Sequence, residues 1–397
     1  MKVFVIHSRR TGYGVIRSLT NLPNIKFFIG DTHNTPVFKS KYVEQGFIIS
    51  DITKVTEDEF LKEMICLAEL MDYQTEKPLV YTGKDDYLIF FSKNYAILKD
   101  YFRLSFETDF NKLRRALSKF ELIDVAKRAN VKIPVSFTNE DSIEAILSNS
   151  NFPLIVKPAL KNKPEIDVVK EAFRVKKCFN QIELESAMKL LTSLNVSYVV
   201  QEYVQGGDNE LYTIGTYSYE GELKAWSTSK KLRQFPPNTG ECSFGVTTYS
   251  EDLVDLARRL LGEIGLSGIS QIEFKKFKGQ YYLIEINPRI WSWHQIHKEV
   301  GVNLCLIAAQ HVIGNTTSKM IAPNKNSKST KTWMFLSMDY LYNVRLNKNI
   351  SIVRFVVELL RCDVEAFLNK KDLRPFFSHI WETRKYIKRQ IQLNSRC

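Results

Sequence analysis

The stretch YYLIEINPRIWSW, residues 281–293, is the most informative part of this sequence. It begins like a buried strand and then carries Glu285, Asn287 and Arg289 at alternate positions. Because alternate side chains of a strand point to one face, a carboxylate, an amide and a guanidinium would lie together. A strand face with this composition indicates a polar ligand.

The preceding residues, QIEFKKFKGQ, predict the partner strand of a β-hairpin. Counting outward equally from Gly279 places Glu273 opposite Glu285. The neighbours that would then point to the other face, toward a core, are Ile272, Phe274, Ile284 and Ile286.

Two facing carboxylates repel each other by up to roughly 1 kcal/mol. A divalent cation held by Glu273, Glu285 and Asn287 would offset this repulsion, and such oxygen ligands suit Mg²⁺, with Mn²⁺ as a second candidate. Arg289 would lie on the same side as a fixed donor for a phosphate or an oxyanion. The alternative is that Lys275 or another base neutralises the acids as an ordinary surface pair.

Two further segments point to a nucleotide. Lys157 ends the apolar strand FPLIVKP, where it needs an anion such as a phosphate or a core carboxylate. Lys170 follows a polar loop and is either a second phosphate ligand or a surface lysine. In SYVVQEYVQGGDNELYT, residues 197–213, a strand runs into a glycine bend, which is either a simple turn or a place where backbone could pair with a purine.

The coarse pattern predicts an α/β protein. KVFVIHS, the turn TGYG, a helix and IKFFIG form a strand–turn–helix–strand opening, with PLVYTG and YLIFF as later strands of the same unit. Residues 110–131 have helical spacing, and a hairpin turns at Glu220–Gly221. After a polar linker at 322–331 the chain is basic and mostly helical by pattern. There SIVRFVVELLRC could lie on a membrane surface, but Arg354 interrupts it and favours a packed amphipathic helix.

The chain has 397 residues, a net charge of +12 and six cysteines without C-x-x-C spacing, which indicates reduced thiols. We expect a cytoplasmic protein, because no signal-peptide pattern and no membrane-spanning stretch occurs. The positive charge favours a phosphorylated small molecule. Nucleic acid is not expected as a partner, because no nucleic-acid motif is present.

These pieces, in this order, resemble the ATP-grasp superfamily of carboxylate–amine ligases. The signature runs from strand-Lys-Pro through Q-E-Y-V to Q-I-E-F and I-E-I-N-P-R, and Lys231–Gly240 is similar to the K-x-R-x-x-P-x-x-T-G loops of its carbamoyl-phosphate-synthase-like and D-aspartate-ligase-like branch. The resemblance implies an α/β and α+β chain, with an ATP-grasp fold preceded by a Rossmann-like α/β domain. It implies an N-terminal domain at 1–108, an ATP-grasp domain at 109–320 (lid about 130–204, catalytic part about 205–320) and a basic C-terminal extension at 321–397.

The resemblance also implies roles for single residues. Lys119, Lys157 and Lys170 would contact the nucleotide phosphates, and Asp208 or Glu210 the ribose. Mg²⁺ would be bound by Glu273, Glu285 and Asn287. Arg289 would steady an acyl phosphate and a tetrahedral intermediate, with Lys157 also taking part in catalysis, and Arg233 would grip the substrate carboxylate. The hinge residues that would hold adenine are Gln201, Glu202, Tyr203 and Val204.

Two departures from the family pattern stand out. The loop KNKPEIDVV lacks the glycines that many relatives have, so Lys161 or Lys163 would help to hold the γ-phosphate. Trp291, Trp293 and His294 stand where small residues are common, and would shape a bulkier acceptor pocket.

The function expected from this resemblance is ATP-dependent ligation. A carboxylate would be activated as an acyl phosphate and joined to an amine, giving an amide, ADP and phosphate. His294 or His297 could accept the proton of the amine, although a lone histidine is more often structural. The partners would be small-molecule carboxylate and amine substrates, with a homodimer as a possible assembly. The alternatives are a nucleotide-binding protein without catalysis and a small-molecule kinase on the same fold.

Overall fold

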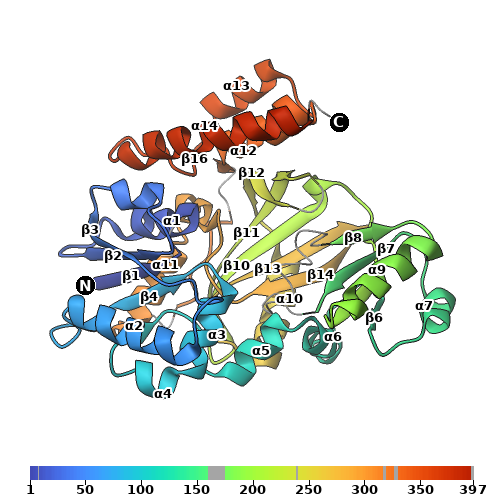
Figure 1. The fold of residues 1–397 in the computed structure, drawn as a ribbon, viewed down its shortest axis with the longest axis horizontal. Helices are drawn as coiled ribbons and strands as arrows, with labels where there is room; N and C mark the ends of the chain where they lie inside the picture. Colours follow the sequence, from blue (N-terminus) through green and yellow to red (C-terminus); the bar gives the residue numbers. More distant parts are fainter. Residues whose placement is uncertain (8, 160–174, 238–239, 316–318, 326–329, 395–397) are drawn as a thin grey trace.

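The computed structural model describes residues 1–397 except 8, 160–174, 238–239, 316–318, 326–329 and 395–397. The described strands form three sheets, of five, four and seven strands. Figure 1 shows the five-stranded sheet on the left, the seven-stranded sheet in the centre and the four-stranded sheet on the right. The C-terminal helices lie above them.

The N-terminal unit is a parallel sheet with the strand order β3-β2-β1-β4-β5. Its central strand is a continuous apolar run with both faces covered, as parallel sheets require. The predicted Rossmann-like opening is therefore confirmed. The strands are β1 (Lys2–Ile6), β2 (Lys26–Asp31), β3 (Val43–Ile48), β4 (Leu79–Thr82) and β5 (Arg103–Leu104). The helices are α1 (Arg9–Leu19), η1 (Pro36–Lys39), α2 (Glu57–Leu70), α3 (Asp85–Lys93) and α4 (Tyr95–Leu98).

Two local predictions in this unit are wrong. YLIFF lies within helix α3 instead of a strand, and the adjacent acids Asp85 and Asp86 in the first turn favour a helix start. TGYG is part of helix α1 instead of a turn. Gly14 allows α1 to approach the central unit closely, because a Cβ atom there would lie 2.7 Å from the ring of His294.

The predicted helix at 110–131 is two helices, α5 (Phe110–Leu117) and α6 (Lys119–Arg128). Ser118 separates them with an extended backbone and caps α6 by accepting a hydrogen bond from the amide of Glu121. These helices lead into an antiparallel sheet of order β6-β9-β7-β8. Its elements are β6 (Ser136–Thr138), α7 (Ile143–Asn149), β7 (Leu154–Pro158), β8 (Lys176–Cys178), α9 (Gln181–Ser193) and β9 (Tyr198–Glu202).

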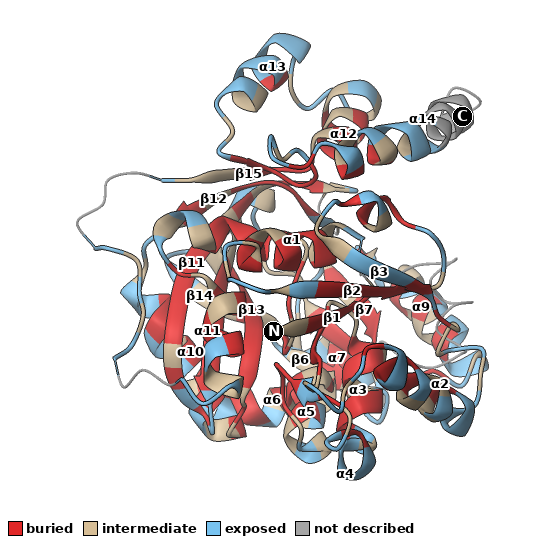
Figure 2. Cartoon of the chain, turned by 90° about the vertical axis from the view of Figure 1, so that its left-hand side faces the viewer, coloured by how far each residue is buried: buried red, intermediate tan, exposed pale blue. Residues whose placement is uncertain are grey.

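The central sheet has the order β14-β13-β10-β11-β12-β15-β16. Its elements, with the flanking helices, are η2 (Asp208–Glu210), β10 (Leu211–Tyr219), β11 (Glu222–Phe235), β12 (Glu241–Thr248), α10 (Glu251–Ile264), β13 (Gly268–Phe277), β14 (Gln280–Asn287), η3 (His294–Val300) and α11 (Leu304–Val312). The predicted hairpin at Glu220–Gly221 joins β10 to β11. Figure 2 shows that the strands of this sheet are buried along most of their length.

The residues after 320 are partly strand and partly helix. Two short strands, β15 (Thr332–Met334) and β16 (Val364–Glu365), extend the central sheet beyond β12. The helices are α12 (Leu336–Asp339), the π-helix η4 (Tyr340–Leu346), α13 (Ile352–Leu360) and α14 (Arg374–Asn394). In the described part of the chain, no helix combines the length and the apolar character needed to cross a bilayer.

Candidate active site

The β13–β14 hairpin pairs Glu273 with Glu285, as the sequence predicted. The route to this pairing differs from equal counting. Lys278 and Gly279 form a two-residue turn with positive φ angles of 47° and 77°, which pairs Phe277 with Gln280. A register shift next to Glu273 then restores the opposition of the two acids.

The register shift also changes which side chain enters the core. Leu283 pairs with Phe274 and is 2% exposed, whereas Ile284 is only half-buried. The expectation that Ile284 faces the core is therefore wrong. The extra residue of a bulge shifts the alternation by one, so that Leu283 instead of Ile284 points to the core. The apolar face that backs the acids consists of Ile272, Phe274, Leu283 and Ile286.

Glu273 is paired with Lys231 of β11, a residue that the local pattern did not identify as its partner. Lys231 Nζ lies 3.0 Å from Glu273 Oε1, and the two side chains are 7% and 10% exposed. Burial alone would lower the pKa of Lys231, but the charge of Glu273 raises it above the ordinary value. Lys275, the base considered from sequence, instead donates to Tyr203 Oη at 3.2 Å.

A chain of amides links the two strands. Asn287 Nδ2 donates to Glu285 Oε1 at 2.8 Å and to Gln271 Oε1 at 3.3 Å. Gln271 Nε2 donates to Glu273 Oε1 at 2.8 Å. The two acids therefore belong to one hydrogen-bonded cluster in which Glu273 and Asn287 are buried and Glu285 is half-buried.

Arg289 connects this cluster to the N-terminal unit. Its Nη2 donates to Asn287 Oδ1 at 3.3 Å and its Nε to Asp85 Oδ1 at 2.5 Å. Asp85 is the first residue of α3, and its side chain is 7% exposed. Burial alone would lower the pKa of Arg289, whereas Asp85 and Glu285 raise it above the ordinary value.

The cluster also reaches the segment after the hinge. Lys231 Nζ lies 3.5 Å from Gln234 Oε1. Gln234 donates to Asp208 through its backbone amide at 3.0 Å and through Nε2 at 2.7 Å. Glu210 lies near the same segment. Burial lowers the pKa of Lys275, and the charges of Asp208 and Glu210 partly offset this lowering. Five of the predicted residues, Asp208, Glu273, Glu285, Asn287 and Arg289, thus lie in one polar network.

The predicted adenine hinge lies at the end of β9. Gln201 Nε2 donates to Ser136 Oγ at 2.6 Å. The amides of Glu202 and Tyr203 donate to the carbonyls of Val135 and Pro153 at 2.9 and 3.0 Å. These two amides already serve the four-stranded sheet.

Two of the three predicted phosphate lysines, Lys119 and Lys157, lie near the end of β7. Lys157 is 8% exposed and lies opposite Val199 of β9. Lys119 Nζ, at the start of α6, donates to the carbonyl of Pro158 at 2.7 Å. Lys170 lies outside the described residues, as do Lys161 and Lys163.

The structure gives Arg233 two carboxylate partners from the C-terminal extension. Arg233 Nη2 lies 2.7 Å from an oxygen of Asp339 and 2.7 Å from one of Glu358. Burial alone would lower its pKa, but the hydrogen bonds and charges of these acids raise it. Arg233 and Asp208 line a pocket of about 610 Å³ that also includes Asn343, Asn347 and Arg354 of the extension. A substrate carboxylate at Arg233 would have to share the guanidinium with the two acids.

The Trp-Ser-Trp segment is core in this structure. Trp291 and Trp293 are 3% and 1% exposed and pack against glycines of β10 and β12, where a Cβ would lie within 2.7 Å of an indole ring. Burial lowers the pKa of His294 to about 4 and that of His297 to about 3, so both are neutral near pH 7. The prediction that these tryptophans shape an acceptor pocket is therefore wrong, because both indole rings are closely packed in the core.

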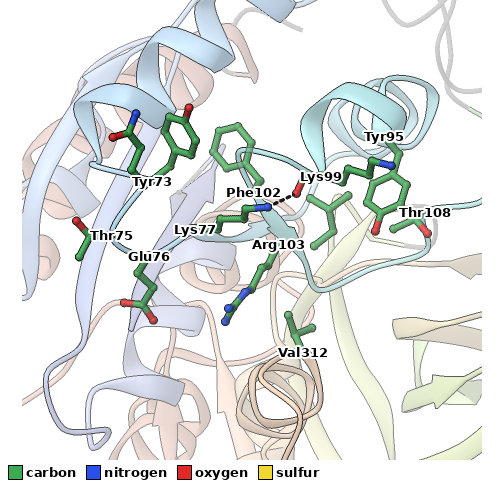
Figure 3. A pocket seen from close by; sticks show the side chains of 12 residues that line it. Tyr73, Thr75, Glu76, Lys77, Tyr95, Lys99, Phe102, Arg103, Thr108 and Val312 are labelled. Carbon is green, nitrogen blue, oxygen red and sulfur yellow. Dashed lines mark hydrogen bonds between the residues drawn. The ribbon is translucent and has the colours of Figure 1, made fainter.

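A second pocket, of about 530 Å³, lies in the N-terminal unit (Figure 3). Its lining comes from residues 73–77 before β4, from residues 95–108 around β5 and from Val312 of α11. None of the predicted site residues lines it. The polar network described above is therefore the better candidate for an active site.

The network also suits a metal bound together with a nucleotide. In the part of the chain that the structure describes, no three His, Cys, Asp or Glu side chains gather as a metal site of their own. Glu273 and Glu285 contribute two carboxylates, which are hard oxygen ligands that fit Mg²⁺ when phosphate oxygens complete its shell. Asn287 turns its amide nitrogen toward Glu285 and its oxygen toward Arg289, so its amide would have to rotate to bind the ion through oxygen.

Comparison with known proteins finds similarity in sequence over part of the chain. A family model described as ATP-grasp in the biosynthetic pathway with Ter operon matches residues 196–333. The carbamoyl phosphate synthase large chain of Clostridium perfringens is 37% identical over 65 residues, which are 16% of this chain and 6% of that relative.

Solved structures share the fold. The L-amino acid ligase of Bacillus licheniformis has a TM-score of 0.58 at 19% identity, covering 80% of this chain and 75% of that one. The N5-carboxyaminoimidazole synthetase of Staphylococcus aureus with ADP has a TM-score of 0.62 at 11% identity, covering 90% and 86%. The biotin carboxylase of Campylobacter jejuni has a TM-score of 0.59 at 16% identity, covering 80% and 72%. The family model thus makes residues 196–333 similar to ATP-grasp proteins, and the solved structures show a shared fold over most of the chain.

Proposed function

We propose that this chain is an ATP-dependent ligase that activates a substrate carboxylate as an acyl phosphate and joins it to an amine. The observation that carries the proposal is the single polar network from Asp208 through Glu273 to Arg289, because it gathers cation-binding acids and an oxyanion donor. The similar structures include an amino acid ligase and a synthetase that binds ADP, which supports this class of reaction.

In this proposal the nucleotide lies between the four-stranded sheet and the central sheet. Lys119 and Lys157 contact its phosphates, with Lys170 as a further ligand. Residues Gln201–Val204 hold adenine through backbone groups, and Asp208 or Glu210 binds the ribose. Mg²⁺ would be held by Glu273, Glu285 and Asn287, and would neutralise phosphate charge when bound.

The reaction needs no protein nucleophile. The carboxylate oxygen attacks the γ-phosphorus of ATP, the bond to the β-phosphate oxygen breaks, and ADP leaves. The amine then attacks the acyl carbon, phosphate departs with the bonding pair, and the departing phosphate takes up the proton that the amine loses. Arg289, fixed by Asp85, stabilises the negative oxygen of the intermediate, and Lys157 neutralises charge on the transferred phosphoryl group.

Arg233 is proposed as the ligand of the substrate carboxylate. It lines the pocket of about 610 Å³ beside Asp208, and the asparagine side chains there suit a polar substrate. Asp339 and Glu358 compete for the same guanidinium. The pocket therefore favours a substrate that brings further hydrogen-bonding groups along with its carboxylate.

A screen of carboxylate and amine pairs with ATP and Mg²⁺ tests the proposal. We expect ADP release with at least one pair and a product whose mass is the sum of both substrates minus water. Phosphorylation without condensation would instead identify a small-molecule kinase, and nucleotide binding without ADP release from any pair would identify a binding protein. The Arg289→Ala variant should bind ATP but release no ADP.

A further inference from the structure

Helix α13 presents an apolar face to solvent. Ile352, Val353, Val356, Val357 and Leu360 are 51%, 70%, 43%, 41% and 81% exposed. Counted from Ile352, the other four residues follow at one, four, five and eight positions, which places all five on one side of the helix. An uncovered apolar stripe of this kind marks an interaction surface.

The opposite side of α13 attaches it to the protein. Phe355 is its one buried residue and packs in a small cluster with Met334 and Phe244. Figure 2 shows α13 projecting at the top of the molecule, largely exposed. The sequence favoured a packed amphipathic helix, but only this narrow side is packed.

The same part of the chain carries most of the net positive charge. Residues 321–397 contain eight Lys and seven Arg against three Asp and three Glu, so nine of the twelve net charges lie here. Arg345 and Lys348 before α13 and Arg361 after it are exposed. The apolar stripe is therefore flanked by cations that face solvent.

We propose that α13 docks this protein on an anionic lipid bilayer. The apolar stripe would enter the headgroup boundary, and the flanking cations would pair with lipid phosphates. A second copy of the chain is a poorer occupant, since it would bring the same excess of positive charge.

Helix α14 also carries exposed aromatic side chains that suit a membrane interface. Phe377 and Trp381 are 62% and 70% exposed, and aromatic side chains of this kind are enriched at membrane interfaces. The contact would be interfacial, which agrees with the finding that no described helix can span a bilayer. This docking does not depend on the proposed ligase chemistry.

Vesicle binding by the full chain tests the proposal. We expect cosedimentation with vesicles of phosphatidylcholine plus phosphatidylglycerol, weaker binding to phosphatidylcholine alone, and weakening by added salt. Val353→Gln combined with Leu360→Gln should lower the partition coefficient at least about tenfold, because two exposed apolar side chains no longer enter the bilayer. A circular dichroism spectrum and unfolding midpoint like those of the wild type would show that the variant is folded.

The matched control is Ile182→Gln on α9, since Ile182 is 78% exposed but lies in another part of the molecule. This variant should bind vesicles like the wild type. The proposal is overturned if the wild type does not bind anionic vesicles, or if the double variant binds as well as the control. It is also overturned if the double variant only converts a dimer into a monomer, because α13 would then bind a second copy.

Discussion

The ion pair between Lys231 and Glu273 allows a direct test of the network. At 3.0 Å, and with an effective dielectric constant of about 20, two unit charges attract by about 5 kcal/mol. Lys231→Met keeps the length of the side chain but removes this attraction. It also removes the desolvation cost of the ammonium group, so we expect a net loss of about 3 kcal/mol in the free energy of unfolding.

Urea unfolding of the variant without divalent cations measures this loss. Lys325→Met is the matched control, because Lys325 forms a 2.7 Å pair with Glu251 in which both side chains are more than 60% exposed. Removing such an exposed pair should lower the stability much less than removing the buried pair, because solvent screens its charges. A double variant, Lys231→Met with Glu273→Gln, should recover much of the stability, because no carboxylate is then left without its partner.

Magnesium adds a second measurement to the same variant. If Glu273 and Glu285 bind the ion, Mg²⁺ should stabilise Lys231→Met by about 2.7 kcal/mol at a hundredfold excess over its dissociation constant. The reasoning is refuted if Lys231→Met loses no more stability than Lys325→Met. The metal assignment alone fails if the stability falls as expected but Mg²⁺ restores none of it.

Three further predictions concern single residues. Glu285→Gln should raise the Mg²⁺ concentration needed for nucleotide binding by roughly tenfold, and an unchanged titration would count against its role. Asp85→Asn should lower kcat roughly tenfold while the KM for ATP stays constant, because Arg289 loses its anchor, whereas Asp86→Asn should change neither. The pKa of His297 is lowered to about 3 by burial, so the unfolded chain takes up the proton first and stability falls as the pH drops below about 6.5. Between about pH 7.5 and 5.5 His297 should contribute about 1.4 kcal/mol to the loss, and urea unfolding of His297→Met should show a loss smaller than that of the wild type by this amount.

Sequence reasoning worked where the chemistry is local. The hairpin brings Glu273 and Glu285 together because a glycine turn and an alternating pattern specify which side chains share a face. The sequence pattern did not predict the register shift that turns Leu283 instead of Ile284 toward the core, because both residues are equally apolar. Similarly, YLIFF is too short for periodicity to distinguish a buried strand from a buried helix.

The network partners could not be found in the same way. Lys231 is 42 residues from Glu273, and Asp85 is 204 residues from Arg289. Nothing near either residue signals its partner, since a lysine beside another lysine and an acid in the first turn of a helix are common. The partner of Gln234 could not be predicted either, because its contact with Asp208 depends on how β11 lies beside η2. Such pairs are decided by the arrangement of the sheets.

The contacts of Arg233 show that the residues after 320 also shape the candidate site. Asp339 is fully buried and binds Arg233, Ser243 and Asn343 at once. Glu358, on α13, binds the same guanidinium and also pairs with Arg354. A helix whose outer face is apolar is thus joined by its inner face to the pocket beside Asp208. Because a buried arginine needs its acids, the position of α13 and the charge balance of that pocket are physically coupled.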